Sequence, residues 1–384
     1  MLGVAMTDGY DVIVVGVGAM GSATCYQLAS RGVRVLGLEQ FAIPHDSGSS
    51  HGISRLFRLA YYEHPDYVPL LRQAMALWHR LEAESGQRLV YQTGLLYLGK
   101  PDGEVIAGSL RSGQQHGLPL EQVGRAEVAR RFPQFVMPDD FVAMHELTAG
   151  FLLSERCIAA HVDVALQHGA DIRGNEAVIT WSADAHGASV TTTRGTYHAD
   201  RLVFCGGAWS EKLISGLGVP LRVSRQVMGW VQPKDPAAFR LGKFPCWAVD
   251  PDDGSLFYGF PMTADGAGLK LARHLPGPTV DPDTLDRQPV AADDSEFRPA
   301  LKQHLPSADG PVVSMRVCMY TNSSDGHFIL DRHPQHENVF VAAGFSGHGF
   351  KFASVVGQAM AEMSIGDGRS SLPIDFLRLR RFNQ

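Results

Sequence analysis

The sequence predicts an α/β protein in which a buried parallel sheet flanked by helices is joined to a separate antiparallel sheet. Residues 10–39 read as one strand, turn, helix and strand, and residues 202–209 form a second buried strand that ends in glycines. Residues 223–271 instead alternate short strands with turns, which is typical of an antiparallel sheet. A chain of 384 residues can bury a core in each of two domains.

The opening unit begins with a strand covered on both faces, because residues 12–15 are a continuous apolar and β-branched run. Gly16, Gly18 and Gly21 follow it directly in the pattern G-x-G-x-x-G. We expect Gly16 to permit a tight turn, Gly18 to let a pyrophosphate approach the backbone, and Gly21 to let the helix lie close to the strand. Between a strand and a helix, this pattern predicts a dinucleotide site.

The second half of the unit indicates which dinucleotide it binds. We expect the phosphates at the helix N-terminus, beside Ala19 and Met20. The second strand ends in Glu39, which is followed by Gln40 and lies where a carboxylate accepts both hydroxyls of an adenosine ribose. This acid favours FAD or NAD over NADP. The stretch alone does not distinguish FAD from NAD.

Composition excludes several classes of protein. Hydrophobic residues at 45% and charged residues at 19% are ordinary for a globular enzyme, and a net charge of −6 offers no basic surface for nucleic acid. No apolar run reaches the length of a membrane span, and residues 1–9 lack the features of a signal peptide. We expect a cytoplasmic monomer that binds neither nucleic acid nor membrane. Five widely spaced cysteines argue against a disulfide framework or a metal site, namely Cys25, Cys157, Cys205, Cys246 and Cys318.

Residues 41–58 are rich in Gly, Ser and His, and we expect them to form a polar loop over a ligand, with Ser50 and His51 in it. Arg55 and Arg58 are three residues apart, so a helical turn starting here would point both the same way. Two guanidiniums on one face suit a phosphate or a substrate carboxylate. A solvated basic surface is the alternative.

The remaining elements are predicted from periodicity and turn residues. Helices are expected at 67–85, 110–116, 125–131, 156–168, 295–305 and 352–363. Strands are expected at 92–98, 170–172, 177–181, 189–193, 196–199, 226–232, 246–249, 255–260, 269–271, 312–320, 328–330 and 339–342. Gly206 belongs to a second glycine turn at a strand end, which is typical of flavoproteins with two dinucleotide folds and favours FAD. We expect a Rossmann-like FAD-binding domain from residues 1–90, 150–222 and 322–384, and a substrate domain from 91–149 and 223–321.

Four segments in register resemble one known family. They are Ser49-Ser-His-Gly-x-Ser-Arg-x-x-Arg58, Gly268-Leu-Lys-x-x-x-His274, Cys318-Met-Tyr-Thr-x-x-x-Asp-x-His-Phe328 and Gly344-Phe-Ser-Gly-His-Gly-Phe-Lys351. The chain resembles the family of monomeric sarcosine oxidase, N-methyltryptophan oxidase and pipecolate oxidase over nearly its whole length. Members of that family oxidise secondary amino acids with FAD, give an imine that hydrolyses, and release hydrogen peroxide as oxygen takes up the electrons.

The resemblance implies a role for each motif residue. Cys318 would carry the flavin as an 8α-S-cysteinyl thioether, and Lys270 and Arg55 would be cations near the flavin ring that assist oxygen reduction. Arg58 and Lys351 would bind the substrate carboxylate, and His274 would lie near the substrate amine. The last glycine turn, with Gly347, His348 and Gly349, would border the flavin, and Tyr258 and Tyr320 would form pocket walls. The alternative for each of these residues is an ordinary structural role as a buried thiol, a core aromatic or a surface cation.

The departures from the family concern the substrate. Trp247-Ala248 lies where the sarcosine enzyme has a pocket methionine, and Ile53-Ser54 replaces the usual Asp-Thr. Sarcosine, a bulkier N-methyl amino acid and a cyclic imino acid such as pipecolate therefore remain possible substrates. A catalytically silent FAD-binding protein and an NAD-dependent dehydrogenase are the alternatives from other classes.

Overall fold

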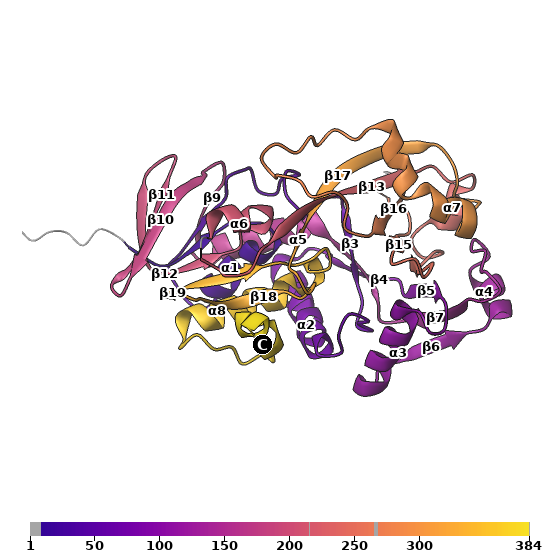
Figure 1. Ribbon diagram of the computed structural model, residues 1–384, viewed down its shortest axis with the longest axis horizontal. Coiled ribbons are helices and arrows are strands. Elements are labelled where there is room, and N and C mark those ends of the chain that lie inside the picture. Colours follow the sequence, from indigo (N-terminus) through magenta and orange to yellow (C-terminus); the bar gives the residue numbers. More distant parts are fainter. Residues whose placement is uncertain (1–8, 215, 265–267, 384) are drawn as a thin grey trace, which may run out of the picture.

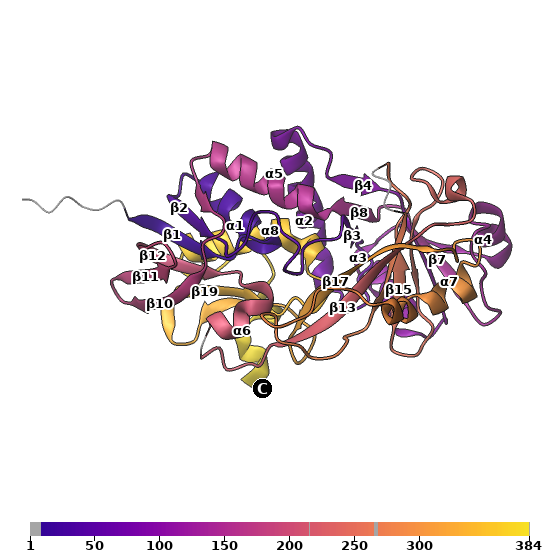
Figure 2. The same ribbon diagram turned by 90° about the horizontal axis from the view of Figure 1, so that it is seen from above.

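The computed structural model describes residues 9–214, 216–264 and 268–383. Residues 1–8, on which most of the expectation about a signal peptide rests, lie outside the described residues. The molecule is elongated, with one large sheet in each half (Figures 1 and 2). Two long strands, β13 (Arg222–Val231) and β17 (Val312–Asn322), run through the middle of the molecule (Figure 2).

The first sheet contains the predicted dinucleotide unit. Its parallel strands lie in the order β19, β12, β1, β2 and β9, and three antiparallel strands extend it. The bounds are β1 (Tyr10–Val15), β2 (Val35–Leu38), β9 (Asp171–Arg173), β10 (Val178–Asp184), β11 (Gly187–Thr192), β12 (Thr196–Phe204), β18 (Ile329–His333) and β19 (His336–Ala343). The four residues at the end of β1 are buried, as the apolar run predicts.

Helix α1 (Ala19–Ala29) is buried along its whole length, between the sheet and helices α5 (Ser154–Gln167) and α8 (Ala353–Ile365). Such close packing requires small residues. A Cβ atom added to Gly357 of α8 would lie 2.5 Å from the backbone of Ala23 in α1. Helix α2 (Tyr67–Ser85) packs on α5 and α8 and has the predicted bounds.

Gly21→Ala is expected to lower the free energy of unfolding by about 1–3 kcal/mol, because an added methyl group has no space to enter. Its Cβ would lie 1.7 Å from the backbone oxygen of Gly16. Urea denaturation measures the change. Gly124→Ala is the matched control, since a Cβ at Gly124 meets nothing within 4 Å, and it should change the stability by less than about 0.5 kcal/mol. Equal stability of the two variants would contradict the close packing of the glycine turn.

The second sheet is mostly antiparallel and has the strand order β17, β13, β16, β15, β14, β5, β7 and β6, with only the β14 and β5 pair parallel. The further strands are β5 (Leu95–Gly99), β6 (Leu120–Val123), β7 (Val142–Glu146), β14 (Cys246–Val249), β15 (Leu256–Gly259) and β16 (Leu269–His274). Helices α3 (Glu104–His116), α4 (Arg125–Arg131) and α7 (Arg298–His304) lie in this half (Figure 1). A three-stranded sheet of β3 (Ser54–Phe57), β8 (Gly150–Leu153) and β4 (Val90–Gln92) lies between the halves.

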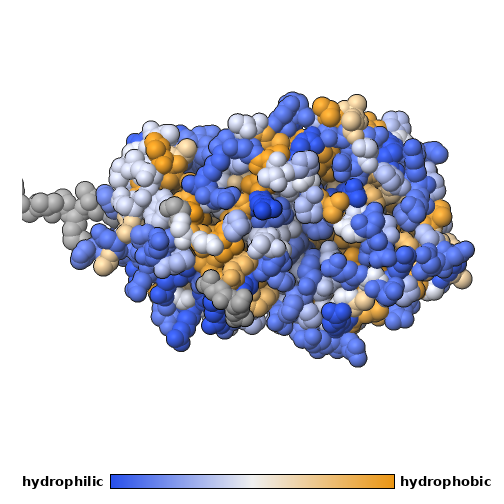
Figure 3. Space-filling model, viewed as in Figure 1, coloured by the Kyte–Doolittle hydropathy of each residue, from blue (hydrophilic) through white to orange (hydrophobic). Residues whose placement is uncertain are grey.

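Short helical turns complete the described chain. They are α6 (Ser210–Leu213), η1 (Gly207–Trp209), η2 (Pro236–Phe239), η3 (Ala291–Glu296), η4 (Phe350–Phe352), η5 (Asp375–Leu377) and η6 (Leu379–Asn383). The face seen in Figure 3 is mainly hydrophilic, with several separate hydrophobic patches. Such scattered patches are ordinary, because apolar atoms form a large part of any protein surface.

The structure corrects several predicted elements. The strand at 92–98 is broken at Gly94, which has φ +71°. Helix α3 begins at Glu104 rather than at residue 110, because Gly108 packs against Tyr62 and tertiary contact outweighs its low helix propensity. Helix α7 covers less of the chain than the predicted 295–305, and β12 joins two predicted strands into one.

The most consequential correction concerns the predicted helical turn at Arg55 and Arg58. Residues 54–57 form strand β3 instead, because they pair with β8. Side chains three residues apart in an extended chain point to opposite faces. The two arginines therefore do not share one anion site, and each belongs to a different part of the site.

Candidate active site

A cavity of about 440 Å³ begins at the carboxyl end of β1. Gly16 turns the chain there with φ +90°, and the N-terminus of α1 has no side-chain cap on its free N–H groups. The Glu39 carboxylate closes the turn, because Val17 N–H donates to it at 2.9 Å and Phe41 N–H at 3.1 Å. This buried acid and the open helix N-terminus provide the two contacts that a dinucleotide needs.

Most of the predicted cofactor residues line this cavity, namely Gly16, Gly18, Ala19, Met20, Glu39, Gln40, Ser50, Arg55, Gly206, Cys318, Gly347 and Gly349. The other predicted cofactor residues, Gly21, His51, His348 and Lys351, are not among the residues that line the cavity. The cavity is also lined by Ser49 and Thr321, whose buried hydroxyls have no hydrogen-bond partner among the described residues. Unpaired buried hydroxyls in a glycine-rich cavity fit a polar ligand such as FAD.

Cys318 lies on β17 at the wall of this cavity and is 4% exposed. Arg55 Nη2 donates to its sulfur at 3.8 Å and to Ser49 O at 3.0 Å. Burial raises the pKa of the Cys205 thiol and of the Cys246 thiol to about 12. A thiol beside a guanidinium is the arrangement expected of a reactive cysteine.

Lys270 lies on β16 and is buried, with 3% exposure. Its ammonium donates to Gly52 O at 2.7 Å and to Ser54 O at 2.6 Å, so two backbone carbonyls fix its position. Burial lowers the pKa of Lys270 well below its usual value, and the nearby Arg55 cation lowers it further. Ser54 O also accepts from Arg55 Nη1 at 2.9 Å, so the two cations share one carbonyl.

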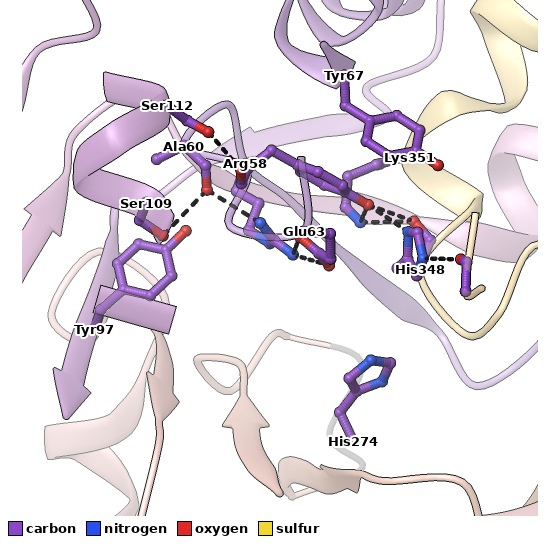
Figure 4. A network of polar contacts seen from close by, with 12 residues as sticks. Arg58, Ala60, Glu63, Tyr67, Tyr97, Ser109, Ser112, His274, His348 and Lys351 are labelled. Carbon is purple, nitrogen blue, oxygen red and sulfur yellow. Dashed lines mark hydrogen bonds and ion pairs between the residues drawn. The ribbon is translucent and has the colours of Figure 1, made fainter. Parts of the chain in front are cut away.

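A buried polar network surrounds Arg58 (Figure 4). Arg58 Nη2 donates to the Glu63 carboxylate at 2.7 Å, and Nη1 donates to Ala60 O at 3.0 Å. The guanidinium lies 4.1 Å from the centre of the Tyr61 ring. Burial alone would raise the pKa of Glu63, but the Arg58 cation lowers it to about 2. Sequence reasoning missed Glu63, because a single acid five residues after Arg58 belongs to no periodic pattern.

Lys351 joins the same network from the turn before α8. Its ammonium donates to His348 O at 2.8 Å and to Tyr61 OH at 3.4 Å. Burial, reinforced by the Arg58 cation, lowers the pKa of Lys351 to about 7. The Tyr61 hydroxyl also lies 2.6 Å from His348 Nδ1. The structure therefore brings Arg58 and Lys351 together around one tyrosine, although they are far apart in the chain.

His274 points toward this network from the second sheet (Figure 4). Its Nδ1 lies 3.1 Å from the hydroxyl of Tyr320, and burial lowers the pKa of His274 to about 4, so the ring is neutral near pH 7. Tyr320 and Tyr258 both line the cavity. The network and the cavity thus meet at this end.

Trp247 and Ala248, which lie where the sarcosine enzyme has a pocket methionine, point to opposite faces of their strand. Trp247 is fully buried, and its ring lies 6.2 Å from that of Phe135 in the core of the second sheet. Ala248 points to the opposite face of β14, where it pairs with Tyr258. Ala248 is therefore the residue on the side of the cavity.

The described part of the chain contains neither a membrane-spanning helix nor a candidate metal site. No helix there is both long and apolar enough to span a membrane. Nor do His, Cys, Asp and Glu side chains gather there in a group that could hold a metal ion.

Comparison with known proteins adds independent evidence. Residues 11–363 match the family model described as FAD dependent oxidoreductase. The chain is 40% identical over 380 residues to monomeric sarcosine oxidase of Streptomyces avermitilis, which covers 98% of each chain. It is 34% identical over 378 residues to N-methyl-L-tryptophan oxidase of Salmonella dublin, which covers 98% of this chain and 100% of the relative.

Solved structures resemble the fold. NikD in an open form, an unusual amino acid oxidase essential for nikkomycin biosynthesis, is 27% identical with a TM-score of 0.85, over 97% of this chain and 98% of that one. Glycine oxidase from Geobacillus kaustophilus has a TM-score of 0.80 at 22% identity, over 98% of this chain and 99% of the other, and this likeness concerns the fold alone.

Proposed function

The chain belongs to the FAD dependent oxidoreductase family, and from this premise we propose that it oxidises a secondary amino acid with FAD and uses oxygen as the electron acceptor. The product would be an imine that hydrolyses, together with hydrogen peroxide. One observation carries the proposal. A thiol and an arginine line the cavity, a buried lysine shares a backbone carbonyl with that arginine, and a second pair of buried cations lies in the network toward which His274 points. The relatives named sarcosine and N-methyl-L-tryptophan oxidase support the same chemistry.

We assign the cofactor contacts as follows. The turn at Gly16 and Gly18 and the N-terminus of α1 would hold the pyrophosphate, and Glu39 would bind the adenosine ribose. Cys318 would carry the covalent thioether link. When bound, FAD supplies the acceptor for the electrons of the amine. On this assignment residues 1–90, 150–222 and 322–384 form the FAD-binding domain, and residues 91–149 and 223–321 form the substrate domain.

Arg58 and Lys351 would bind the substrate carboxylate, because both are buried cations of one network. A buried ion pair already joins Arg58 to Glu63, so an incoming carboxylate would share or replace that partner. The neutral ring of His274, held by Tyr320, would accept a hydrogen bond from the substrate amine. Tyr258 and Ala248 would border the rest of the substrate.

Lys270 and Arg55 would act on oxygen. Both are fixed by backbone carbonyls, so little reorganisation is needed when negative charge develops on oxygen. Fixed positive charge in a site shielded from water stabilises such charge strongly. On this proposal Arg58 and Lys351 act on the substrate, and Lys270 and Arg55 act on oxygen.

A peroxide assay with sarcosine, N-methyltryptophan, pipecolate and proline tests the proposal. We expect peroxide from at least one of them, and a much weaker response to the corresponding amide, which lacks the carboxylate. Protein that binds FAD but forms no peroxide with any of them would instead support a catalytically silent FAD-binding protein. A colourless protein that requires NAD would overturn the assignment of the cofactor.

Carboxylate binding is expected to weaken with rising pH. The ammonium form of Lys351 attracts a carboxylate, and a bound carboxylate stabilises that form, so binding raises the pKa of Lys351 above its free value of about 7. The Kd of an unreactive carboxylate such as propionate should be constant below pH 7 and increase between the free and bound pKa values. Titration of the flavin absorbance measures it. Lys351→Met should weaken binding by about 10- to 100-fold and remove this pH dependence.

A further inference from the structure

The turn at residues 52–54 connects Lys270 to a carboxylate on the other side of the backbone. Its carbonyl groups at Gly52 and Ser54 accept from the Lys270 ammonium at 2.7 and 2.6 Å. Its N–H groups point to Glu155, because Gly52 N–H donates to Glu155 Oε1 at 2.7 Å and Ile53 N–H donates to Oε2 at 3.0 Å. One side of the turn therefore binds a cation and the other side binds an anion.

The backbone of this turn is strained. Ile53 has φ +74°, a conformation that is a genuine outlier for a β-branched residue. Gly52 has φ +99°, and a Cβ atom there would lie 2.6 Å from Cε of Met228. Strained backbone persists only where the surrounding contacts impose it, and such strain gathers at functional sites.

Glu155 provides those contacts. It lies in the first turn of α5, and Ser154 Oγ donates to its Oε2 at 2.7 Å. Ser154 N–H donates to Ile53 O at 2.9 Å. The first turn of α5 therefore binds both the N–H groups and a carbonyl group of the 52–54 turn. Burial alone would raise the pKa of Glu155, but the hydrogen bonds from Ser154, Ile53 and Gly52 lower it. The carboxylate is therefore ionised at neutral pH.

We propose that Glu155 is a positioning residue for oxygen reduction, which holds the strained turn at Gly52 and Ile53 so that its carbonyls fix the Lys270 ammonium. This inference rests on the proposed role of Lys270. Glu155 itself lies on the far side of the turn, and its negative charge favours the ammonium form of Lys270. It acts through the backbone and not by contact with oxygen.

Glu155→Gln tests the proposal in the purified flavoprotein. The carboxamide keeps the size of the side chain but replaces one acceptor oxygen with a donor that faces an N–H group. We expect oxidation of the substrate-reduced protein by oxygen to slow by about 10- to 100-fold, whereas reduction by substrate without oxygen should change by less than about twofold. Stopped-flow absorbance measures the two half-reactions separately.

Hydrogen exchange gives a readout that needs no catalysis. In Glu155→Gln, the amides of Gly52 and Ile53 should exchange about 10- to 100-fold faster than in the natural protein, because both would donate to a neutral carboxamide, which is a weaker acceptor than the carboxylate. Glu82→Gln is the matched control. Glu82 accepts from two successive N–H groups at the start of β4, Leu89 at 2.7 Å and Val90 at 2.9 Å. It should leave both half-reactions and the 52–53 amides unchanged.

Chemical rescue distinguishes a positioning role from general stability. Glu155 also lines a surface hollow of about 510 Å³, together with Phe41, Pro44, His51 and Asn175, so small anions can reach its place from solvent. Formate should restore part of the oxygen reaction in Glu155→Ala but not alter the Glu82→Gln control. If Glu155→Ala does not fold, Ser154→Ala removes only the hydroxyl bond and should show a smaller loss in the same half-reaction.

Equal slowing of both half-reactions, or unchanged exchange at Gly52 and Ile53 in Glu155→Gln, would overturn the proposal. If the exchange increases but no substrate reduces the flavin in any form of the protein, the turn is held as described and the proposed oxidase function has failed. The two failures are therefore separable.

Discussion

Lys270→Met is expected to slow the reaction of the reduced protein with oxygen by about 10²- to 10³-fold, and to leave reduction by substrate nearly unchanged. The buried ammonium is fixed by Gly52 O and Ser54 O, so its charge is already in place when oxygen acquires negative charge. Removing one preorganised donor from such a site commonly has an effect of this size. Methionine is an unbranched side chain of similar length that removes the charge and the hydrogen-bond donors of the ammonium.

The control for this prediction is Lys351→Met. Lys351 is also a buried lysine held by a backbone carbonyl, but it lies in the network around Arg58. We expect it to impair substrate binding and to leave the oxygen reaction close to that of the natural protein. If both variants slowed the two half-reactions alike, the assignment of separate cation groups to substrate and oxygen would be wrong.

Cys318→Ala is expected to abolish covalent retention of the flavin. Protein precipitated with acid should lose its yellow colour to the supernatant, whereas the natural protein should keep it in the pellet. The reason is that Cys318 combines a place on the cavity wall with a guanidinium at 3.8 Å from its sulfur. Absorbance of pellet and supernatant at visible wavelengths measures the result.

Cys205 supplies the matched control, because it is a second thiol that lines the same cavity. Burial raises the pKa of Cys205 to about 12, which makes its thiolate scarce. Cys205→Ala should therefore keep the covalent flavin. Flavin that stayed in the pellet of Cys318→Ala, or was lost from Cys205→Ala, would count against Cys318 as the attachment site.

Local patterns predicted much of the fold. The run at residues 12–15 and the three glycines after it predicted β1, the turn and α1, because strand, turn and helix signals lie within a few residues of one another. Helix α2 was predicted to the residue, since its apolar stripe repeats with the helical period. The boundaries of α3 and α7 were wrong, because packing against other elements outweighs local propensity at helix ends.

The arrangement of the site was harder to predict from the sequence than the fold. Arg55 and Arg58 were expected on one face of a helical turn, and pairing of β3 with β8 placed them on opposite faces. Glu63 and Glu155 were not selected at all, because single acids in short segments have no recurring pattern. Their importance comes from partners that the fold supplies, a guanidinium for Glu63 and two backbone N–H groups for Glu155.

By itself the sequence determined the dinucleotide unit, the two kinds of sheet and the motifs that resemble amino acid oxidases. These depend on spacing within short stretches, where the order of residues sets the geometry. Only the tertiary structure decided which charges meet. Lys270 and its carbonyl at Gly52 are 218 residues apart, and Glu155 and Gly52 are 103 apart. No local pattern encodes such contacts, because they form only when β3, β16 and the start of α5 pack together.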